Sequence, residues 1–474
     1  MRKYRNILFY VIVTASLLFV MYEIVQAGHL LEKYKIIPVN IGGSSSTTEI
    51  FKAHISNNVS GSLSILLMQI IAIIFTARIF GFLFRKLGQP AVIGEVAAGI
   101  ILGPSVIGFF FPSFSSFVFP QNSLGTLQLF SQLGLILFMF VVGMEVNLNS
   151  LKNKAGNAIV ISHASIIIPY TLGIALAYFL YKEYANANTD FLSFSLFIGI
   201  AMSITAFPVL ARIIKERKMT DSAIGNLAIT CAAADDVTAW CILAAVISIA
   251  KAGSSITALF TIALAIIYVL VMFKIVMPLL QKLSSKYFNK NDLTMNMVAL
   301  MIGVLLVSSF ITELIGIHAL FGAFLAGVVM PSTMNFRKLL IERTEYISVT
   351  LLLPLFFAFS GLRTQIGLLN TSHAWLVCCA SIIVAILGKF GGSFLAAKFV
   401  GESWRDSAII GALINTRGLM ELVVLNIGYD LGIISSEIFT MMVIMALFTT
   451  CMTGPLLNLL KSKSGSPKVG KSER

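Results

Sequence analysis

The sequence predicts an all-α polytopic membrane protein. Of its 474 residues, 57% are hydrophobic and only 12% are charged, and the mean hydropathy is +0.92. A soluble domain of this size cannot cover its surface with so few charged groups. Apolar stretches of about 20 residues, the length that crosses the hydrocarbon core as a helix, recur along the chain. Helices are expected because they satisfy their own backbone hydrogen bonds inside lipid.

Short polar loops divide the chain into about 14 expected transmembrane helices. Residues 1–27 are predicted to form an N-terminal transmembrane helix or signal anchor, which crosses the membrane at 6–26. A cleaved signal peptide is the alternative, because a basic start precedes the apolar run, and cleavage would leave 13 crossings. Residues 28–61 predict an extracytoplasmic linker. The other crossings are expected at 62–84, 91–110, 125–146, 156–181, 191–211, 223–250, 256–281, 294–314, 317–331, 347–366, 373–397, 406–428 and 435–460.

The distribution of basic residues orients these crossings. With the N-terminus in the cytoplasm, the inside segments hold 24 Lys and Arg residues and the outside loops hold five. This bias favours an even number of spans in the cell (inner) membrane, with both termini and the basic tail 461–474 in the cytoplasm. The net charge of +13 therefore serves orientation, and we expect no nucleic-acid partner.

Internal similarity links the two halves of the chain. "IGEVAAGIILGP" at 93–104 resembles "FGAFLAGVVMP" at 321–331. "LILFMFVVGMEVNLNSL" at 135–151 aligns without gaps to "LPLFFAFSGLRTQIGLL" at 353–369. A chance resemblance between glycine-rich membrane helices is the alternative explanation. The two alignments place Gly94 on Gly322, Gly99 on Gly327, Gly143 on Gly361 and Glu145 on Arg363.

The matched segments begin on opposite sides of the predicted membrane. Residues 62–460 would therefore hold two inverted six-helix repeats, at about 62–250 and 294–460, joined by a linking helix at 256–281. Inverted repeats are typical of secondary transporters, whose substrate site lies near the midplane between discontinuous helices.

Two crossings carry signals for a break in the helix. The sixth contains Pro208 in "SITAFPVLARI", and proline removes a backbone donor. The thirteenth contains Asn415, Arg417, Gly418 and Glu421 about halfway through. We expect crossed discontinuous helices with breaks at Pro208 and Gly418. The alternative is a simple proline kink in one helix and a buried ion pair between Arg417 and Glu421 in the other.

Three further charges lie near the middle of predicted spans. They are Asp235 and Asp236 in "AAADDVTAW" and Lys389 in "GKFGG". Each costs at least about 2.5–3.5 kcal/mol at the bilayer centre, so such charges are retained mainly for function or pairing. Adjacent helical residues point about 100° apart, so one aspartate can meet Lys389 while the other faces a water-filled cavity. Arg363, near the end of its span, is expected to extend to the membrane surface instead.

These carboxylates suggest exchange chemistry. A buried carboxyl group with charged neighbours can exchange protons near neutral pH, and without its proton it is a hard oxygen ligand for an alkali cation. If only the loaded site can face both sides, competition between proton and cation produces obligatory exchange. A purely structural bridge between Lys389 and one aspartate is the alternative, and it leaves the second aspartate unexplained.

The stretches "LGQPAVIGEVAAGIILGPSVIG", "SITAFPVLARI", "CAAADDVTAW", "GKFGG" and "NTRGLMELVV", in this order, resemble the monovalent cation:proton antiporter superfamily. The similarity is to the branch with Kef-type systems, Nap-type antiporters and plant cation/proton exchangers, and it covers residues 62–460. It implies a homodimer that exchanges Na⁺ or K⁺ for H⁺ by an elevator-like motion, without a cofactor. The two-acid form with a lysine implies electrogenic exchange.

The resemblance also implies residue roles. Asp236 would bind the transported alkali cation and the proton alternately, Asp235 would pair with Lys389, and Thr205 would lie beside the ion. We expect Arg417 and Glu421 to form a further ion pair coupled to the site.

Other function classes make different demands. An intramembrane aspartyl protease needs its two acids on different helices, so adjacent aspartates argue against an enzyme. A cation channel would pass ions without moving protons. An inverted-repeat solute symporter would need a larger polar cavity than these few midmembrane groups provide.

Overall fold

The computed structural model describes residues 2–32, 48, 51, 54–55, 58–146, 155–219, 222–251, 255–287, 295–331 and 334–462. The chain divides into two compact units, Met1–Gly61 and Ser62–Arg474. The first unit contains α1 (Arg2–Glu32), on which the large apolar side chains described between Ile12 and Val25 are exposed. Most of the predicted linker 28–61 and nearly all of the tail 461–474 lie outside the described residues.

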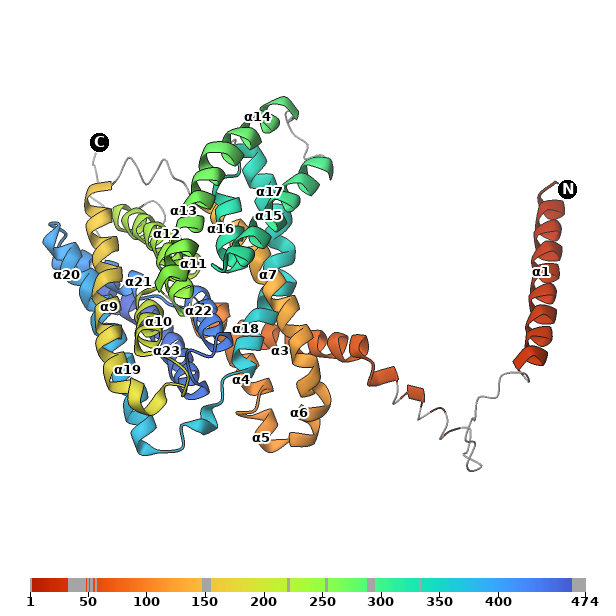
Figure 1. The fold of residues 1–474 in the computed structure, drawn as a ribbon, viewed down its shortest axis with the longest axis horizontal. Coiled ribbons are helices and arrows are strands. Elements are labelled where there is room, and N and C mark those ends of the chain that lie inside the picture. Colours follow the sequence, from red (N-terminus) through yellow and green to blue (C-terminus); the bar gives the residue numbers. More distant parts are fainter. Residues whose placement is uncertain are drawn as a thin grey trace, which may run out of the picture. The chain divides into compact units, whose positions relative to one another are not determined.

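The second unit is built from helices (Figure 1), and its described part contains one isolated β-bridge between Ala185 and Ile434. Its elements are α3 (Ser62–Lys86), α4 (Ala91–Leu102), α5 (Ile107–Phe110), α6 (Pro112–Val118), η1 (Gln121–Ser123), α7 (Leu124–Glu145), α9 (Ala155–Tyr184), α10 (Phe191–Ser203), α11 (Phe207–Glu216), α12 (Ala223–Lys251), α13 (Ser255–Val271), η2 (Met272–Val276), α14 (Met277–Tyr287), α15 (Met295–Ile315), α16 (Ala319–Val328), α17 (Met334–Ile347), η3 (Ser348–Leu352), α18 (Leu353–Leu362), η4 (Ile366–Leu368), α19 (Ser372–Ile386), η5 (Leu387–Gly391), α20 (Gly392–Phe399), α21 (Trp404–Ile414), α22 (Leu419–Asp430) and α23 (Ser436–Ser462).

Ten of the described helical stretches are long and apolar enough to cross a membrane. All of the expected crossings fall on described helices, and the sixth and thirteenth each consist of two half-helices, α10 with α11 and α21 with α22. The predicted all-α polytopic fold with discontinuous helices is therefore confirmed. Continuous α-helix is interrupted by π-helical turns at η2, η3 and η5, which the sequence did not indicate.

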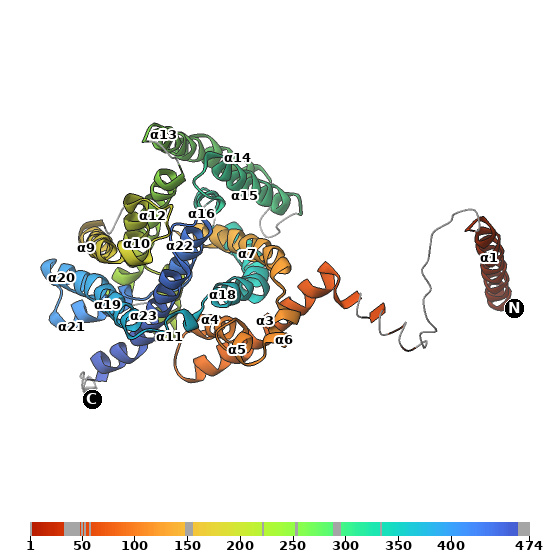
Figure 2. The same ribbon diagram turned by 60° about the horizontal axis from the view of Figure 1, so that its bottom comes forward.

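The helices of the second unit form two groups (Figure 2). In one, which we call the crossing group, α9–α12 pack with α19–α23. In the other, which we call the scaffold group, α3, α4 and α7 pack with α15–α18. The helix α13, which continues through η2 into α14, contacts both α12 and α15 and so connects the two groups.

Glycines at the positions matched in the sequence repeat make equivalent helix contacts. A Cβ atom on Gly143 or on Gly327 would lie 2.1 Å from a backbone oxygen of the opposite helix, so α7 and α16 require glycine there. On Gly99 and Gly361 it would lie 2.2 Å and 2.5 Å from a backbone oxygen, so α4 and α18 meet in the same way. Small residues permit such close approach between membrane helices. Each repeat thus contributes one helix to each close pair.

Candidate functional site

The two broken helices meet at their breaks. Residues 204–206 interrupt the helix between α10 and α11, residues 415–418 interrupt it between α21 and α22, and the backbone N–H of Ala206 donates to the carbonyl of Thr416 at 3.1 Å. Gly418 has a φ of +148°, a conformation that favours glycine. Pro208 is the second residue of α11, where a missing backbone N–H costs nothing. The proline therefore begins a half-helix and does not kink a continuous one.

Two cationic side chains bind the carbonyl end of α10. The Arg417 guanidinium donates to the carbonyls of Ala201 at 2.9 Å and Met202 at 2.7 Å. The Lys389 ammonium donates to the carbonyl of Ser203 and, at 3.1 Å, to that of Ser165 on α9. These carbonyls carry the negative end of the helix dipole, so cations are favourable there. Lys389 lies in the π-helical turn η5, a feature often found at functional sites.

Asp235 is buried with a full set of partners. Its carboxylate accepts hydrogen bonds from Ser162 at 2.6 Å, Ser165 at 2.6 Å and Thr205 at 2.7 Å. Lys389 Nζ lies 3.6 Å from Asp235 Oδ2, and both side chains are 0% exposed. The structure thus brings Asp235 and Lys389 together. The two serines come from α9, and sequence reasoning did not include them.

Asp236 has the opposite environment. It is 1% exposed, and neither carboxylate oxygen has a hydrogen-bond partner in the described part of the protein. The backbone N–H of Phe207, the first residue of α11, lies near this carboxylate but makes no hydrogen bond with it. The hydroxyl of Thr205, expected beside the ion, is used by Asp235. A water-filled cavity beside Asp236 stays a prediction.

Further polar atoms without partners lie at the second break. Arg417 Nη1 is 3.4 Å from Glu421 Oε1, in the first turn of α22. The other Glu421 oxygen and both polar atoms of the Asn415 side chain are buried without a hydrogen-bond partner among the described residues. The predicted Arg417–Glu421 contact is present. The open oxygens of Asp236, Asn415 and Glu421 are of the kind that hard cations prefer.

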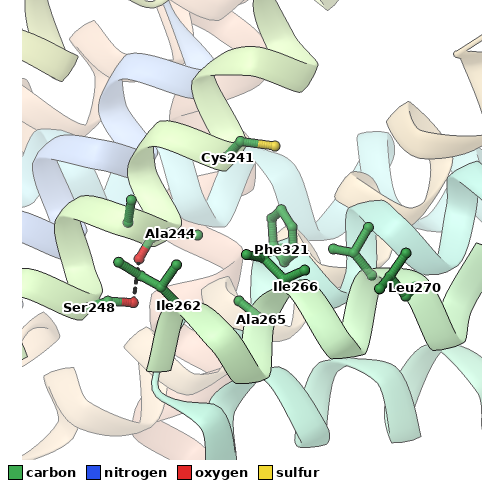
Figure 3. Close-up of a pocket in the computed structure, with 10 residues that line it drawn as sticks. Cys241, Ala244, Ser248, Ile262, Ala265, Ile266, Leu270 and Phe321 are labelled. Carbon is green, nitrogen blue, oxygen red and sulfur yellow. Dashed lines mark hydrogen bonds between the residues drawn. The ribbon is translucent and has the colours of Figure 1, made fainter. Parts of the chain in front are cut away.

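A separate pocket of about 300 Å³ lies between α12, α13 and α16 (Figure 3). In Figure 3, Ile262 of α13 lies beside Ala244 and Ser248 of α12, and Ile266 of α13 lies beside Phe321 of α16. Its one hydroxyl, on Ser248, already donates to the carbonyl of Ala244 at 2.8 Å. The lining is otherwise apolar and contains no carboxylate that could neutralise a cation.

Comparisons with known proteins agree with this architecture. The family described as "Sodium/hydrogen exchanger, transmembrane" matches residues 71–460. The chain is 42% identical over 399 residues to Na(+)/H(+) antiporter NhaS4 of Synechocystis, an alignment that covers 84% of this chain and 97% of that protein.

Longer eukaryotic relatives match over part of their length. Identity is 39% to Cation/H(+) antiporter 17 of Arabidopsis thaliana, over 85% of this chain and 49% of that protein. It is 34% to K(+)/H(+) antiporter 1 of Saccharomyces cerevisiae, over 88% and 48% respectively. The chain therefore spans about half the length of these relatives.

A solved structure has the same fold. It is the sodium proton antiporter MjNhaP1 of Methanocaldococcus jannaschii, with a TM-score of 0.63 and 16% sequence identity over 85% of this chain and 99% of that one.

Proposed function

The chain belongs to the sodium/hydrogen exchanger family, and we propose that it is a secondary active antiporter that exchanges Na⁺ or K⁺ for H⁺ at Asp236. The relatives named above are Na⁺/H⁺, cation/H⁺ and K⁺/H⁺ antiporters. The observation that carries the role of Asp236 is its pair of buried oxygens without donors, beside a carboxylate that has three.

Mutual exclusion follows from electrostatics. A deprotonated Asp236 is a buried negative charge without a hydrogen bond, a state that costs several kcal/mol in a low-dielectric interior. Either a proton or one alkali cation removes that charge. Carrying both would leave a net positive charge in the same place, so the two ligands compete.

The same cost explains the coupling of the two fluxes. Moving the crossing group with an empty, charged site would take an unpaired carboxylate past the apolar scaffold group. Loaded with a proton or a cation, the site is neutral and can face either side. One ligand must therefore be carried out before the other is carried in, which is antiport by alternating access.

We further propose that exchange is electrogenic, with two protons exchanged for one cation. Asp235 and Lys389 supply the second titratable position. A cation bound at Asp236 adds a positive charge beside their ion pair, and this favours release of a proton from the pair. Moving one net charge through a potential of 100 mV releases or costs about 2.3 kcal/mol. Exchange in proteoliposomes should therefore respond to an imposed potential, and indifference to the potential would reject this stoichiometry.

The decisive test of antiport is fluorescence dequenching in everted vesicles or proteoliposomes with Na⁺, K⁺ and Li⁺ across a pH series. An antiporter gives saturable cation flux that moves protons, and Asp236→Asn abolishes it. A cation channel passes the ion without moving protons. A solute symporter shows proton movement that depends on an organic substrate and not on the cation.

Purified protein should bind alkali ions less tightly as pH falls, and binding indifferent to pH would contradict competition at Asp236.

The remaining features of the proposal concern assembly and location. We propose a homodimer in the cell membrane, with both termini in the cytoplasm and without a bound cofactor. The family is one of transporters, and no enzymatic step is part of the proposal. Thiol labelling of single cysteines in the basic loops, in intact cells and in everted vesicles, tests this orientation.

A further inference from the structure

Two cavities whose linings include charged side chains lie where the crossing and scaffold groups meet. The first, of about 400 Å³, is lined by the end of α7, by α11 and by α18, and includes Glu145, Lys215 and Glu345. The second, of about 460 Å³, is lined by the start of α7 and the end of α18, and includes Gln128, Arg363 and Tyr429. Because they lie at opposite ends of α7, the two cavities belong to opposite faces of the bundle.

At the second cavity, charged side chains tie the two groups together. Arg363, just past α18, places Nη1 2.8 Å from Asp430 Oδ1 at the end of α22 and 2.9 Å from Asn426 Oδ1. The other Asp430 oxygen accepts from Gln128 of α7 at 2.9 Å. Asn426 in turn donates to Ser360 of α18 at 2.8 Å. The crossing-group helix α22 is thus bound to two scaffold helices.

The guanidinium of Arg363 also lies over two aromatic rings, 4.4 Å from the centre of Phe359 and 5.2 Å from that of Tyr429. Its side chain is 16% exposed and that of Asp430 is 31% exposed. Arg363 therefore meets its partners near the end of its span, where the sequence led us to expect its side chain to reach the membrane surface. It is held in a partly dehydrated contact between the groups.

At the first cavity, the corresponding charges are apart. Glu145 at the end of α7 and Lys215 on α11 line the same cavity, but no ion pair within 4.0 Å joins them in the described structure. Glu345 is the other charged group on this lining. Both ends of the boundary have room for water, but a charge pair joins the two groups only at the second cavity.

The inverted repeat relates the two pairs. The ungapped alignment places Glu145 on Arg363. After the two breaks, Lys215 is the ninth residue of α11, counted from Phe207, and Asp430 is the twelfth of α22, counted from Leu419. A difference of three residues is close to one turn, so the two side chains lie on the same face of their half-helices. Each pair joins a scaffold helix end to a crossing half-helix, with the signs of the charges exchanged.

We propose that Arg363–Asp430 and Glu145–Lys215 are alternating gate pairs: movement of the crossing group opens one and closes the other. This inference rests on the antiport proposed above, because each pair is proposed to close one face of the protein in one of the two transport states. In the present structure the Arg363–Asp430 pair is formed and Glu145 and Lys215 are not paired. The four residues position the groups and do not touch the ion.

The test measures how readily water reaches α22 on the protein-interior side of the Arg363–Asp430 pair. Val423 is 1% exposed and precedes Asp430 by two turns on α22. In a protein with its five cysteines replaced, Val423→Cys is labelled with a membrane-impermeant maleimide in proteoliposomes. Ala211→Cys, on the lining of the Glu145 cavity, reports the opposite face. Asp430→Asn then removes the charge of the gate with little change in shape.

We expect Asp430→Asn to raise the labelling rate of Val423→Cys at least about tenfold and to lower that of Ala211→Cys, because a broken charge pair shifts the two-state equilibrium. Glu437→Gln, a neutralised acid at the start of α23, is the matched control and should change neither rate. Arg363→Gln should reproduce the effect, and Arg363→Asp combined with Asp430→Arg should restore protection.

Unchanged labelling of Val423→Cys in both gate variants would overturn the inference, as would misfolding of both that the charge swap fails to rescue. Exchange measured in the same proteoliposomes separates the two proposals. If the cysteine-free protein shows no Asp236-dependent exchange, antiport fails. If exchange is present but labelling does not respond, the gates fail alone.

Discussion

Two adjacent carboxylates on α12 occupy opposite environments. Asp235, on the side of α9 and η5, receives three hydroxyl donors and lies beside Lys389. Asp236, on the side where α11 begins, is equally buried and receives no hydrogen bond from the described residues. Both carboxylates are therefore buried, but only Asp235 has hydrogen-bond donors. A satisfied carboxylate has little to gain from an ion, whereas an unsatisfied one must acquire a proton or a cation.

The largest effect on exchange should come from removing the unsatisfied charge. Asp236→Asn leaves a neutral amide that can neither release a proton nor neutralise a cation, so we expect exchange to fall by at least about 100-fold, the equivalent of about 2.7 kcal/mol. Thermal unfolding in detergent should be unchanged or improved, because an uncompensated charge is lost. Proton-coupled flux that survives this substitution would remove Asp236 from the mechanism.

The satisfied carboxylate should respond through stability. Lys389→Met leaves Asp235 buried without its cation, and breaking a buried pair from one side costs about 3–5 kcal/mol. The double variant Lys389→Met with Asp235→Asn removes both charges and should recover most of that loss. Unfolding in mixed micelles measures the cycle. A double variant as unstable as the single one would show that packing of the lysine stem, and not the ion pair, is what matters.

Lys389→Ala should also alter the pH dependence or the charge stoichiometry of exchange. Wild-type behaviour in all of these measurements would rule out the bridge as a coupling element.

The capped end of α10 links the two environments. Arg417→Gln removes charge-assisted hydrogen bonds to the carbonyls of Ala201 and Met202 and should cost about 2–3 kcal/mol of stability. Arg417→Lys keeps the charge but loses the planar fork, so it should restore only part of the loss. Full rescue by lysine would mean that charge at the helix end suffices and that the geometry of the two bonds is unimportant.

The sequence was sufficient to predict the breaks, because Pro208 restricts the backbone locally and Gly418 permits a conformation that other residues rarely adopt. It was also sufficient to select Asp235, Asp236 and Lys389, since charge near the middle of a span is costly wherever it points. The rotation of α12 could not be predicted from periodicity, so the sequence did not reveal which donors each aspartate meets. The π-helical turn η5 alters the register of the helix around Lys389, and no residue pattern in the sequence indicated this turn.

The partners of Asp235 were within reach of sequence reasoning. Ser162 and Ser165 are three residues apart, so they share a face of a helix that is otherwise apolar. The partner of Arg363 could not be predicted, because proximity to a span end says nothing about whether an acid such as Asp430 lies there.

The smallest effect should come from a carboxylate at the opposite end of α10, in the loop outside the membrane. Asp190 caps this helix by accepting the backbone N–H of Ser193 at 2.9 Å. Burial acts to raise the pKa of Asp190, but hydrogen bonds from Ser193 lower it below its ordinary value. The stabilisation is therefore present above the unfolded pKa, about 3.9, and is lost as pH falls through the lower folded pKa.

Asp190→Ala should cost about 1 kcal/mol at neutral pH, and Asp190→Ser should keep most of the cap. The difference in unfolding free energy between Asp190→Ala and the parent should be constant from about pH 5 to 8 and shrink only in stronger acid. Exchange should be unaffected, because this carboxylate, like Asp235, already has its donors and is in addition hydrated. A loss of exchange comparable to that of Asp236→Asn would mean that capping of α10, and not an open carboxylate at the crossing, limits transport.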